Sequence, residues 1–145
     1  MTSTMVKRFP DMRLGLSASH SAILDADVIR AYAALSGDHN PIHEDAEYAA
    51  ATRFGRPVAH GLLVAGFVQT ALTKLVAPGG VSASYQFDLV APAYEGTPIT
   101  AEVSCAELDS TRRRATFTLT VVDDNTATTL IRGTAVVAFP KGDQR

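Results

Sequence analysis

The feature that most restricts the fold is the segment from Gly61 to Ala77, the longest helical pattern in the chain. As an α-helix, its seventeen residues would span about 25 Å. Apolar residues extend around more than one face, so we expect most of this helix to be buried. Four apolar residues form one line along the helix: Val64, Val68, Leu72 and Leu75. Leu63, Phe67 and Ala71 widen this apolar surface. Pro78-Gly79-Gly80 then ends the helix.

The sequence after this helix alternates as β-strands do. It is rich in Val, Thr, Phe and Tyr, and Phe117, Leu119 and Val121 alternate with threonines. We expect three or four strands, roughly at Val81–Val90, Ile99–Leu108, Arg113–Val122 and Ala127–Phe139. A hairpin turn is expected at Asp123-Asp124-Asn125, and a bulge or bend at Gly133. Helices followed by a long antiparallel run indicate the α+β class.

A shorter helix is expected earlier in the chain. Asp25 is a good N-cap and Gly37 a good C-terminal residue, and Val28, Tyr32 and Leu35 form an apolar stripe between them. Pro41 forces Asn40 toward an extended conformation, so residues 38–43 are expected to form a loop rather than a helix. Residues 44–52 are then expected to form a short helix, which Arg56-Pro57 breaks.

Asp38 and His43 lie on this short, constrained segment. A carboxylate and an imidazole held close together can converge on one water molecule. Such a pair can remove a proton from water and return one to a substrate carbon. Asn40 can hold its neighbours through side-chain hydrogen bonds. These residues are therefore candidates for acid–base catalysis.

A second candidate element is His60-Gly61, at the start of the long helix. The first N–H groups of a helix have no partner inside it and lie at the positive end of its dipole. A carbonyl or enolate oxygen placed there is stabilised, and glycine allows close approach to the backbone. An acid–base pair beside such a site fits proton transfer next to a carbonyl.

Three segments resemble one known family. Tyr32-Ala-Ala-Leu-Ser-Gly-Asp-His-Asn-Pro-Ile-His43 is similar to the hydratase signature of the MaoC-like (R)-specific enoyl-CoA hydratases. Arg56-Pro-Val-Ala-His-Gly61 resembles the segment that leads into the central helix of that family's hot-dog fold. Phe87-Asp-Leu-Val-Ala-Pro-Ala-Tyr-Glu-Gly96 resembles the strand and turn that follow. The resemblance implies a single hot-dog domain over residues 1–145, with its core at about 9–140 and an antiparallel sheet wrapped around the central helix.

The resemblance also implies an activity. The family are lyases that add water reversibly to trans-2-enoyl thioesters and give (R)-3-hydroxyacyl products. Asp38 and His43 match the catalytic pair that binds the water, and Gly61 matches the backbone N–H that contacts the thioester carbonyl. Asn40 matches a supporting polar position. His60 is expected to have a supporting role, as a packing or hydrogen-bonding residue that sets the start of the helix, with a direct role as the alternative. No metal or other cofactor is needed, the substrate is carried on coenzyme A or acyl carrier protein, and members are usually homodimers.

The acyl pocket is expected along the central helix, with Leu62, Ala65 and Gln69 as candidates. Short-chain members of the family tend to carry a smaller residue than Gln69 at this position, so the acyl chain length stays open. The carrier, the physiological direction and the pathway stay open as well.

Other polar residues have plainer readings. Asp38, His39, His43 and His60 match no standard zinc spacing, so no metal site is predicted. His39 is expected to be exposed, and His20 to be a solvent-facing strand residue. Cys105 is expected to be a small buried hydrophobe. Arg112-Arg113-Arg114 is expected to be a solvated turn, with contact to coenzyme A phosphates as the alternative.

Composition excludes several classes of function. The formal charge of −2 offers no basic field for nucleic acid, and a single cysteine excludes an intramolecular disulfide. The most apolar stretch, residues 61–68, is too short for a membrane span, and no signal peptide is recognised, so we expect a cytoplasmic protein.

Three alternative functions stay open. The first is the reverse reaction, dehydration of (3R)-hydroxyacyl groups on acyl carrier protein in fatty-acid or polyketide synthesis. The second is a hot-dog thioesterase, which the lack of Asp or Glu in residues 61–77 disfavours. The third is a non-catalytic acyl-thioester-binding subunit, which the presence of both Asp38 and His43 disfavours.

Overall fold

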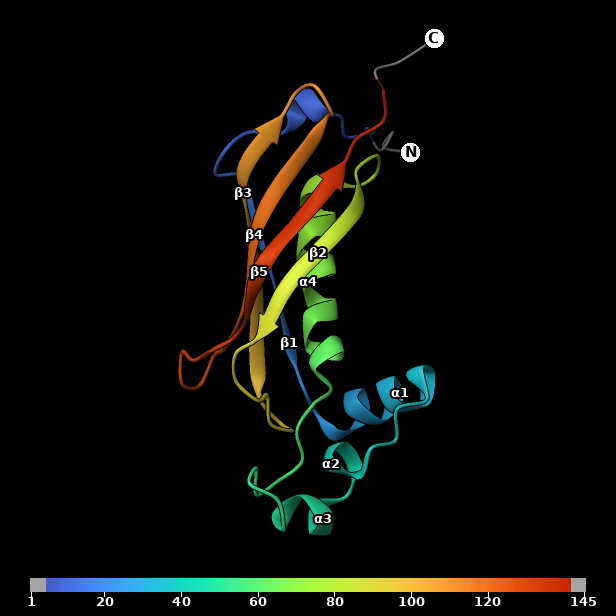
Figure 1. Cartoon of the computed structure of the whole chain (residues 1–145), viewed down its shortest axis with the longest axis vertical. Coiled ribbons are helices and arrows are strands. Elements are labelled where there is room, and N and C mark those ends of the chain that lie inside the picture. Colours follow the sequence, from blue (N-terminus) through green and yellow to red (C-terminus); the bar gives the residue numbers. More distant parts are fainter. Residues whose placement is uncertain (1–4, 142–145) are drawn as a thin grey trace.

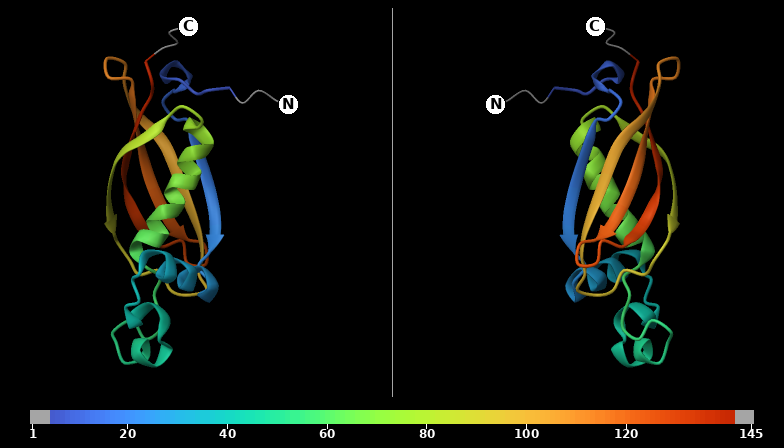
Figure 2. Two further views of the ribbon diagram at one scale, coloured as in Figure 1. Left: turned by 90° about the vertical axis from the view of Figure 1, so that its right-hand side faces the viewer. Right: turned by 90° about the vertical axis from the view of Figure 1, so that its left-hand side faces the viewer.

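One curved antiparallel sheet wraps around one long helix (Figures 1 and 2). The computed structural model describes residues 5–141. The strands are β1 (Ser17–Ile23), β2 (Val81–Leu89), β3 (Pro98–Asp109), β4 (Arg114–Asp123) and β5 (Thr129–Ala138). Their order in the sheet is β1-β3-β4-β5-β2, and every neighbouring pair is antiparallel. The α+β hot-dog arrangement is confirmed.

The long helix, α4 (Gly61–Val76), is buried on one face only. Its sheet-facing side comprises Val64, Val68, Ala71, Leu72 and Val76, all buried. Leu62, on another face, is 64% exposed. The expectation that most of the helix is buried is therefore wrong for that face, because the sheet covers α4 from one side only. Within residues 5–141, no helix is both long and apolar enough to cross a membrane.

The inner face of the sheet shows the expected alternation. Phe117, Leu119 and Val121 point into the core and are at most 1% exposed. Gly133, however, marks no bulge, since the β4–β5 register shift lies at Val121/Val122. A Cβ at Gly133 would overlap the Gln86 carbonyl oxygen on β2. Glycine is therefore explained by close approach of the two strands.

Strand β1 was predicted only through the placement of His20 in a strand. Its sequence, SASHSAI, consists mainly of small residues with weak alternation, as an edge strand tolerates. It pairs with β3 from Ser17↔Ser104 to Ile23↔Pro98. The His20 ring stacks near Phe67 of α4, with centroids 6.0 Å apart. The prediction that His20 faces solvent is wrong, because the side chain lies on the helix-facing side of β1.

Three short helices gather at one end of the sheet: α1 (Ala26–Ser36), α2 (Pro41–Glu44) and α3 (Ala46–Ala50). A 3-10 turn, η1 (Phe9–Asp11), lies at the other end. Asp25 caps α1 by accepting a hydrogen bond from the Val28 N–H at 2.9 Å, as expected. The predicted stripe of α1 is wrong at Leu35, which is 85% exposed; Val28 and Tyr32 are partly buried, and the fully buried residues are Ile29 and Ala33. The helix packs at the end of the sheet by a narrower face than its apolar pattern indicates.

The segment after α1 also differs from expectation. Residues 41–44 form one turn of helix instead of loop, and the next helix begins at Ala46 rather than Glu44 and ends at Ala50. Asn40 is extended, as its position before proline requires (φ −54°, ψ 124°). Proline at the first helical position then favours a helix start, since its missing N–H is not needed there. The restriction that proline places on the preceding residue therefore describes Asn40 correctly, but it does not prevent residues 41–44 from forming a helix.

Candidate active site

Asp38 follows directly after the end of α1. Gly37 ends that helix in the left-handed conformation, with φ of 80°, and its N–H donates to the Ala33 carbonyl at 2.9 Å. The Asp38 side chain is 54% exposed. Its Oδ1 accepts the Asn40 N–H at 3.1 Å. That bond fixes the carboxylate and leaves Oδ2 directed to the site.

His43 is held in one orientation by α2. The Asn40 side chain caps this helix by accepting the Ile42 N–H at 3.2 Å. The His43 ring is 12% exposed, and its Nδ1 lies 2.7 Å from the Val58 carbonyl oxygen. A carbonyl only accepts, so Nδ1 carries the proton, and the lone pair of neutral His43 is on Nε2.

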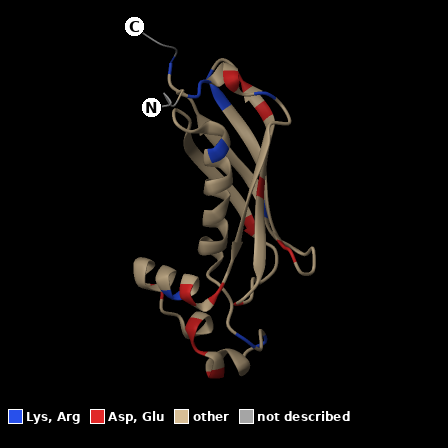
Figure 3. Cartoon of the chain, turned by 180° about the vertical axis from the view of Figure 1, so that it is seen from behind, with Lys and Arg blue, Asp and Glu red and all other residues tan. Residues whose placement is uncertain are grey.

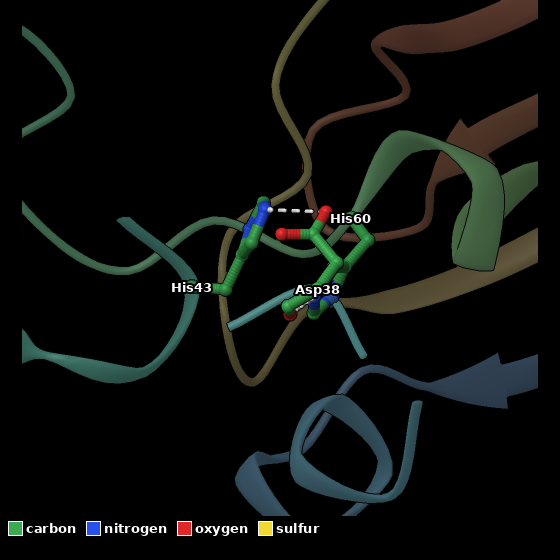
Figure 4. Close-up of side chains that lie close together, drawn as sticks. All are labelled: Asp38, His43 and His60. Atoms are coloured by element: carbon green, nitrogen blue, oxygen red, sulfur yellow. Dashed lines mark hydrogen bonds and ion pairs between the residues drawn. The ribbon is translucent and has the colours of Figure 1, made fainter. Parts of the chain in front are cut away.

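The two free atoms of this pair face each other. His43 Nε2 lies 3.9 Å from Asp38 Oδ2 (Figure 4). That separation is too long for a direct hydrogen bond. A water oxygen about 2.8 Å from both atoms would see them at an angle of about 90° and could donate one hydrogen to each. The geometry therefore suits a pair that binds and activates one water molecule.

His60 contacts both members of the pair and is only 3% exposed. Its Nε2 donates to the Asp38 backbone carbonyl at 3.0 Å. Its ring stacks on His43, with centroids 3.7 Å apart, and Tyr32 meets it edge-on at 4.8 Å. Nδ1 of His60 is buried and has no hydrogen-bond partner among residues 5–141. His60 thus joins Asp38 to His43 through one hydrogen bond and one ring contact.

A metal site is geometrically poor here. Donor atoms of Asp38, His43 and His60 lie within 4.8 Å of one another. The two imidazole planes are inclined by only 25° at 3.7 Å, however, so their in-plane lone pairs run side by side. Zinc needs donors that converge at about 2.0–2.1 Å from one point. One ring would have to turn and lose its backbone hydrogen bond before both could bind the same ion.

Gly61 lies beside this cluster as the first residue of α4. Its N–H has no carbonyl four residues back within the helix. A cavity of about 300 Å³ is lined by Asp38, His43, His60 and Gly61, together with Tyr32, Ser36, Leu62 and Leu89. The structure therefore brings the predicted acid–base pair and the predicted oxyanion residue to one cavity. Asn40 contributes from behind, through its bonds to Asp38 and Ile42.

The three predicted acyl-pocket residues also lie together. Leu62, Ala65 and Gln69 line a cavity of about 170 Å³ between α4 and β2, with Tyr85, Phe87 and Leu119 among the other walls. Leu62 borders both this cavity and the one lined by Asp38 and His43. An acyl chain could therefore extend from the cavity lined by Asp38 and His43 into the cavity lined by Gln69, past the exposed side chain of Leu62.

Other residues singled out in the sequence lie elsewhere. His39 is 62% exposed and pairs with Glu44 at 3.0 Å, as expected for a surface residue. The arginines at 112–114 lie at the β3–β4 hairpin, at the end of the sheet opposite α1–α3. Arg112 and Arg114 are exposed, as expected for a solvated turn, whereas Arg113 is partly buried and its Nε has no hydrogen-bond partner among residues 5–141. Cys105 is 3% exposed, as expected, and burial raises the pKa of its thiol.

The sequence analysis missed two contributors to the site. The Val58 carbonyl sets the His43 tautomer, and backbone carbonyls leave no residue-type signal. Leu89, at the end of β2, lies directly over Gly61: a Cβ built on Gly61 would be 2.5 Å from Leu89 Cδ1. Its position at the end of a strand that runs antiparallel to β5 could not be inferred without the order of the sheet.

The chain is a hot-dog domain in which an aspartate and a histidine face each other beside the first turn of the central helix. A family model described as "MaoC like domain" matches residues 7–127. The chain belongs to the MaoC-like family.

Relatives match over nearly the whole chain. A 3-hydroxybutyryl-CoA dehydratase of Methylorubrum extorquens is 35% identical over 94% of this chain and 86% of its own. An (R)-specific enoyl-CoA hydratase of Rhodospirillum rubrum is 34% identical over 91% of each chain. The solved (R)-hydratase of Aeromonas caviae, involved in PHA biosynthesis, superposes with a TM-score of 0.85 at 32% identity, over 89% of this chain and 98% of that one.

Proposed function

We propose that this protein is a lyase that adds water reversibly to trans-2-enoyl-CoA thioesters and forms (R)-3-hydroxyacyl-CoA products. One observation carries the proposal: His43 Nε2 and Asp38 Oδ2 face each other at 3.9 Å in the cavity that Gly61 also lines. The named relatives, at 33–35% identity over most of the chain, support the same activity.

In the proposed reaction, water is held between the carboxylate of Asp38 and neutral His43. His43 Nε2 takes one proton as the water oxygen bonds to C3 of the enoyl group, and the C2–C3 double bond electrons move toward the carbonyl oxygen. The imidazolium so formed is stabilised by the adjacent carboxylate and returns the proton to C2. The net change is one water added across the double bond.

The charge that develops on the thioester oxygen is assigned to the Gly61 N–H. A backbone donor at a helix start is fixed before the reaction, so no reorganisation is required when charge appears. The first turn of α4 contains no acidic residue that would oppose this charge. Asn40 and His60 are assigned supporting roles, since each touches the pair rather than the cavity centre.

The acyl chain is proposed to enter the cavity lined by Leu62, Ala65 and Gln69. That cavity is smaller than the catalytic one, about 170 against 300 Å³. Gln69 places a polar amide in an otherwise largely apolar wall. Short acyl chains are therefore the proposed substrates.

We also propose a homodimer in which β2 is covered. It is an edge strand, so one side of its backbone lacks a neighbour in the sheet. Val81 and Tyr85 on it are 68% and 37% exposed, and Leu62 on the adjacent open face of α4 is 64% exposed. A second copy would remove this apolar surface from water. Light scattering should then give twice the chain mass of 15.4 kDa.

Hydration of crotonyl-CoA tests the proposed function. Loss of the conjugated enoyl-thioester absorbance should be observed, and the product should be oxidised by an (R)-specific 3-hydroxyacyl-CoA dehydrogenase. Asp38→Asn and His43→Gln should each lower kcat by roughly 10²–10⁴-fold while the fold is retained. His39→Gln, on the same segment but outside the cavity, is the matched control and should retain full activity. Wild-type protein inactive on CoA and acyl-carrier-protein substrates of all chain lengths would refute the proposal.

A further inference from the structure

The end of the sheet opposite helices α1–α3 carries most of the positive charge of the protein. Residues 5–141 contain twelve Lys and Arg and fourteen Asp and Glu. Seven of these cations lie at this end, but only three of the acids, Asp11, Glu107 and Asp109. Figure 3 shows this separation, with mainly Asp and Glu on α1–α3 and most Lys and Arg at the other end. We term this surface the basic end; its cations are Lys7, Arg8, Arg13, Arg112, Arg113, Arg114 and Lys141.

Three segments that are far apart in the sequence build the basic end. The Phe9 ring of η1 meets the Phe139 ring, which follows β5, edge-on with centroids 6.4 Å apart. The Phe139 N–H donates to the Arg113 carbonyl oxygen at 3.0 Å, next to the β3–β4 hairpin. Within that hairpin, the Arg112 N–H donates to Asp109 Oδ1 at 3.0 Å. The cations are therefore carried on a fixed framework, so a partner does not have to order the chain when it binds.

The arginines near the hairpin are not neutralised by the acids of the described chain. Among residues 5–141, no ion pair is found for Arg13, Arg112 or Arg114, and all three residues are exposed. Arg113 is partly buried, and its Nε has no hydrogen-bond partner within the same range. A group of cations without carboxylate partners produces a positive potential that attracts an anionic surface.

Exposed apolar side chains lie among these cations. Leu14, directly after Arg13, is 65% exposed, and Met5 is 81% exposed. Val6 and Leu108 at the same end are exposed as well. Leu14 and Leu108 belong to the β1 and β3 side of the sheet, whereas the proposed dimer covers β2 at the other edge. The proposed dimer therefore leaves these two leucines in water beside the arginines.

We propose that the basic end binds the surface of an anionic lipid bilayer. Arginine and lysine side chains bind lipid phosphates, and apolar side chains beside them enter the boundary between headgroups and acyl chains. Nucleic acid would use the cations, but binding to its phosphate backbone is electrostatic and gives Leu14 no role. The basic end and the proposed active site lie at opposite ends of the sheet (Figure 1), so this inference does not depend on the proposed function.

Co-sedimentation of the full chain with vesicles tests the proposal. The protein should bind vesicles of equal parts phosphatidylcholine and phosphatidylglycerol and not vesicles of phosphatidylcholine alone. Binding should weaken from about 0.1 M to about 1 M salt, because the Debye length falls from about 10 Å to about 3 Å. Arg112→Ala/Arg114→Ala should lower the partition coefficient about 25-fold, or about five-fold for each arginine. Arg30→Ala/Arg132→Ala is the matched control, since it removes the same charge from α1 and β5 outside the basic end, and it should bind as the wild type does.

A further variant separates a lipid surface from other polyanions. Leu14→Ser removes an exposed apolar side chain and no charge, so it should lower the vesicle partition coefficient about ten-fold. Any binding to a labelled DNA duplex, measured in parallel, should be equal in Leu14→Ser and the wild type. Vesicle binding that Leu14→Ser leaves unchanged would overturn the lipid assignment in favour of a general polyanion site. Equal losses in the two arginine double variants, or no binding of wild-type protein to anionic vesicles at about 0.1 M salt, would also overturn the proposal.

Discussion

Replacement of Gly61 by alanine separates two reasons for a glycine at the start of α4. Its φ lies outside the left-handed region, so alanine can adopt the same backbone. The added Cβ would lie 2.5, 3.0 and 3.4 Å from Cδ1, Cδ2 and Cγ of Leu89. Carbon atoms prefer about 3.5–4.0 Å, so Leu89 must retreat by about 1 Å or more.

The expected loss of stability is small. Leu89 is 59% exposed and can move outward at a cost of about 0.5–1.5 kcal/mol, against which alanine gains up to about 1 kcal/mol of helix propensity. The methyl group would remain beside the Gly61 N–H, where the thioester oxygen must approach to about 2.9 Å. Loss of one such donor typically lowers kcat by about 10²–10³-fold, or about 2.7–4 kcal/mol. Gly61→Ala should therefore lose most of its activity and remain folded.

The double variant Gly61→Ala/Leu89→Ala shows why the added methyl group lowers turnover in Gly61→Ala. If the methyl group acts by pushing Leu89, removal of the leucine side chain restores turnover. If it acts by blocking access to the N–H, the double variant stays as slow as Gly61→Ala. Crotonyl-CoA hydration and thermal unfolding are measured on all four proteins of the cycle. Recovery in the double variant would assign the loss to displacement of Leu89. A folded Gly61→Ala with kcat within about three-fold of wild type would refute the requirement for close approach of the thioester oxygen to this N–H.

Three further predictions follow from the site and the core. His60→Phe keeps the ring stack on His43 and loses the hydrogen bond to Asp38, whereas His60→Gln can keep the donor and loses the ring. In His60→Phe, kcat should fall about ten-fold with KM little changed, and the pH–rate profile should shift. In His60→Gln, kcat should recover and the pH–rate profile should not shift. Equal loss in both variants would show that packing alone matters. Gln69→Ala should enlarge the acyl cavity and raise kcat/KM for longer enoyl-CoA substrates relative to crotonyl-CoA, by roughly four-fold for each methylene newly buried; an unchanged preference would place the acyl chain elsewhere. Burial raises the pKa of Cys105 above its ordinary value of 9.0, so the thiol stays neutral in the folded state at a pH where the unfolded chain ionises. Its contribution to stability is present below pH 9.0 and falls as the pH rises above that value. Denaturant titrations between pH 8 and 11 should show this fall, and Cys105→Ala should lack it.

The sequence was most informative where one local rule decides the structure. The long apolar run predicted α4 to within one residue of its C-terminus, and Asp25 and Gly37 marked the start and end of α1. Alternation placed β2 to β5 within two residues. Each of these features depends on spacing or capping, which neighbours along the chain specify.

Features that depend on tertiary contacts could not be predicted in this way. Leu35 belongs to an apolar stripe and is nevertheless exposed, because the position of α1 at the end of the sheet selects the face of Ile29 and Ala33. Leu89 reaches Gly61 only because β2 is the edge strand next to β5. The pairing of His43 Nδ1 with the Val58 carbonyl joins residues fifteen positions apart, and no residue type marks the acceptor.

The two ends of the sheet differ in a way that matters for handling the protein. Helices α1–α3 and the proposed site occupy one end, whereas η1 and the end of β5 lie at the other (Figure 1). A surface linker attached at η1 or at the end of β5 therefore starts at the opposite end of the sheet from helices α1–α3 and the proposed site. Enzyme immobilised through either attachment should present its open cavities to solution and retain its substrate affinity.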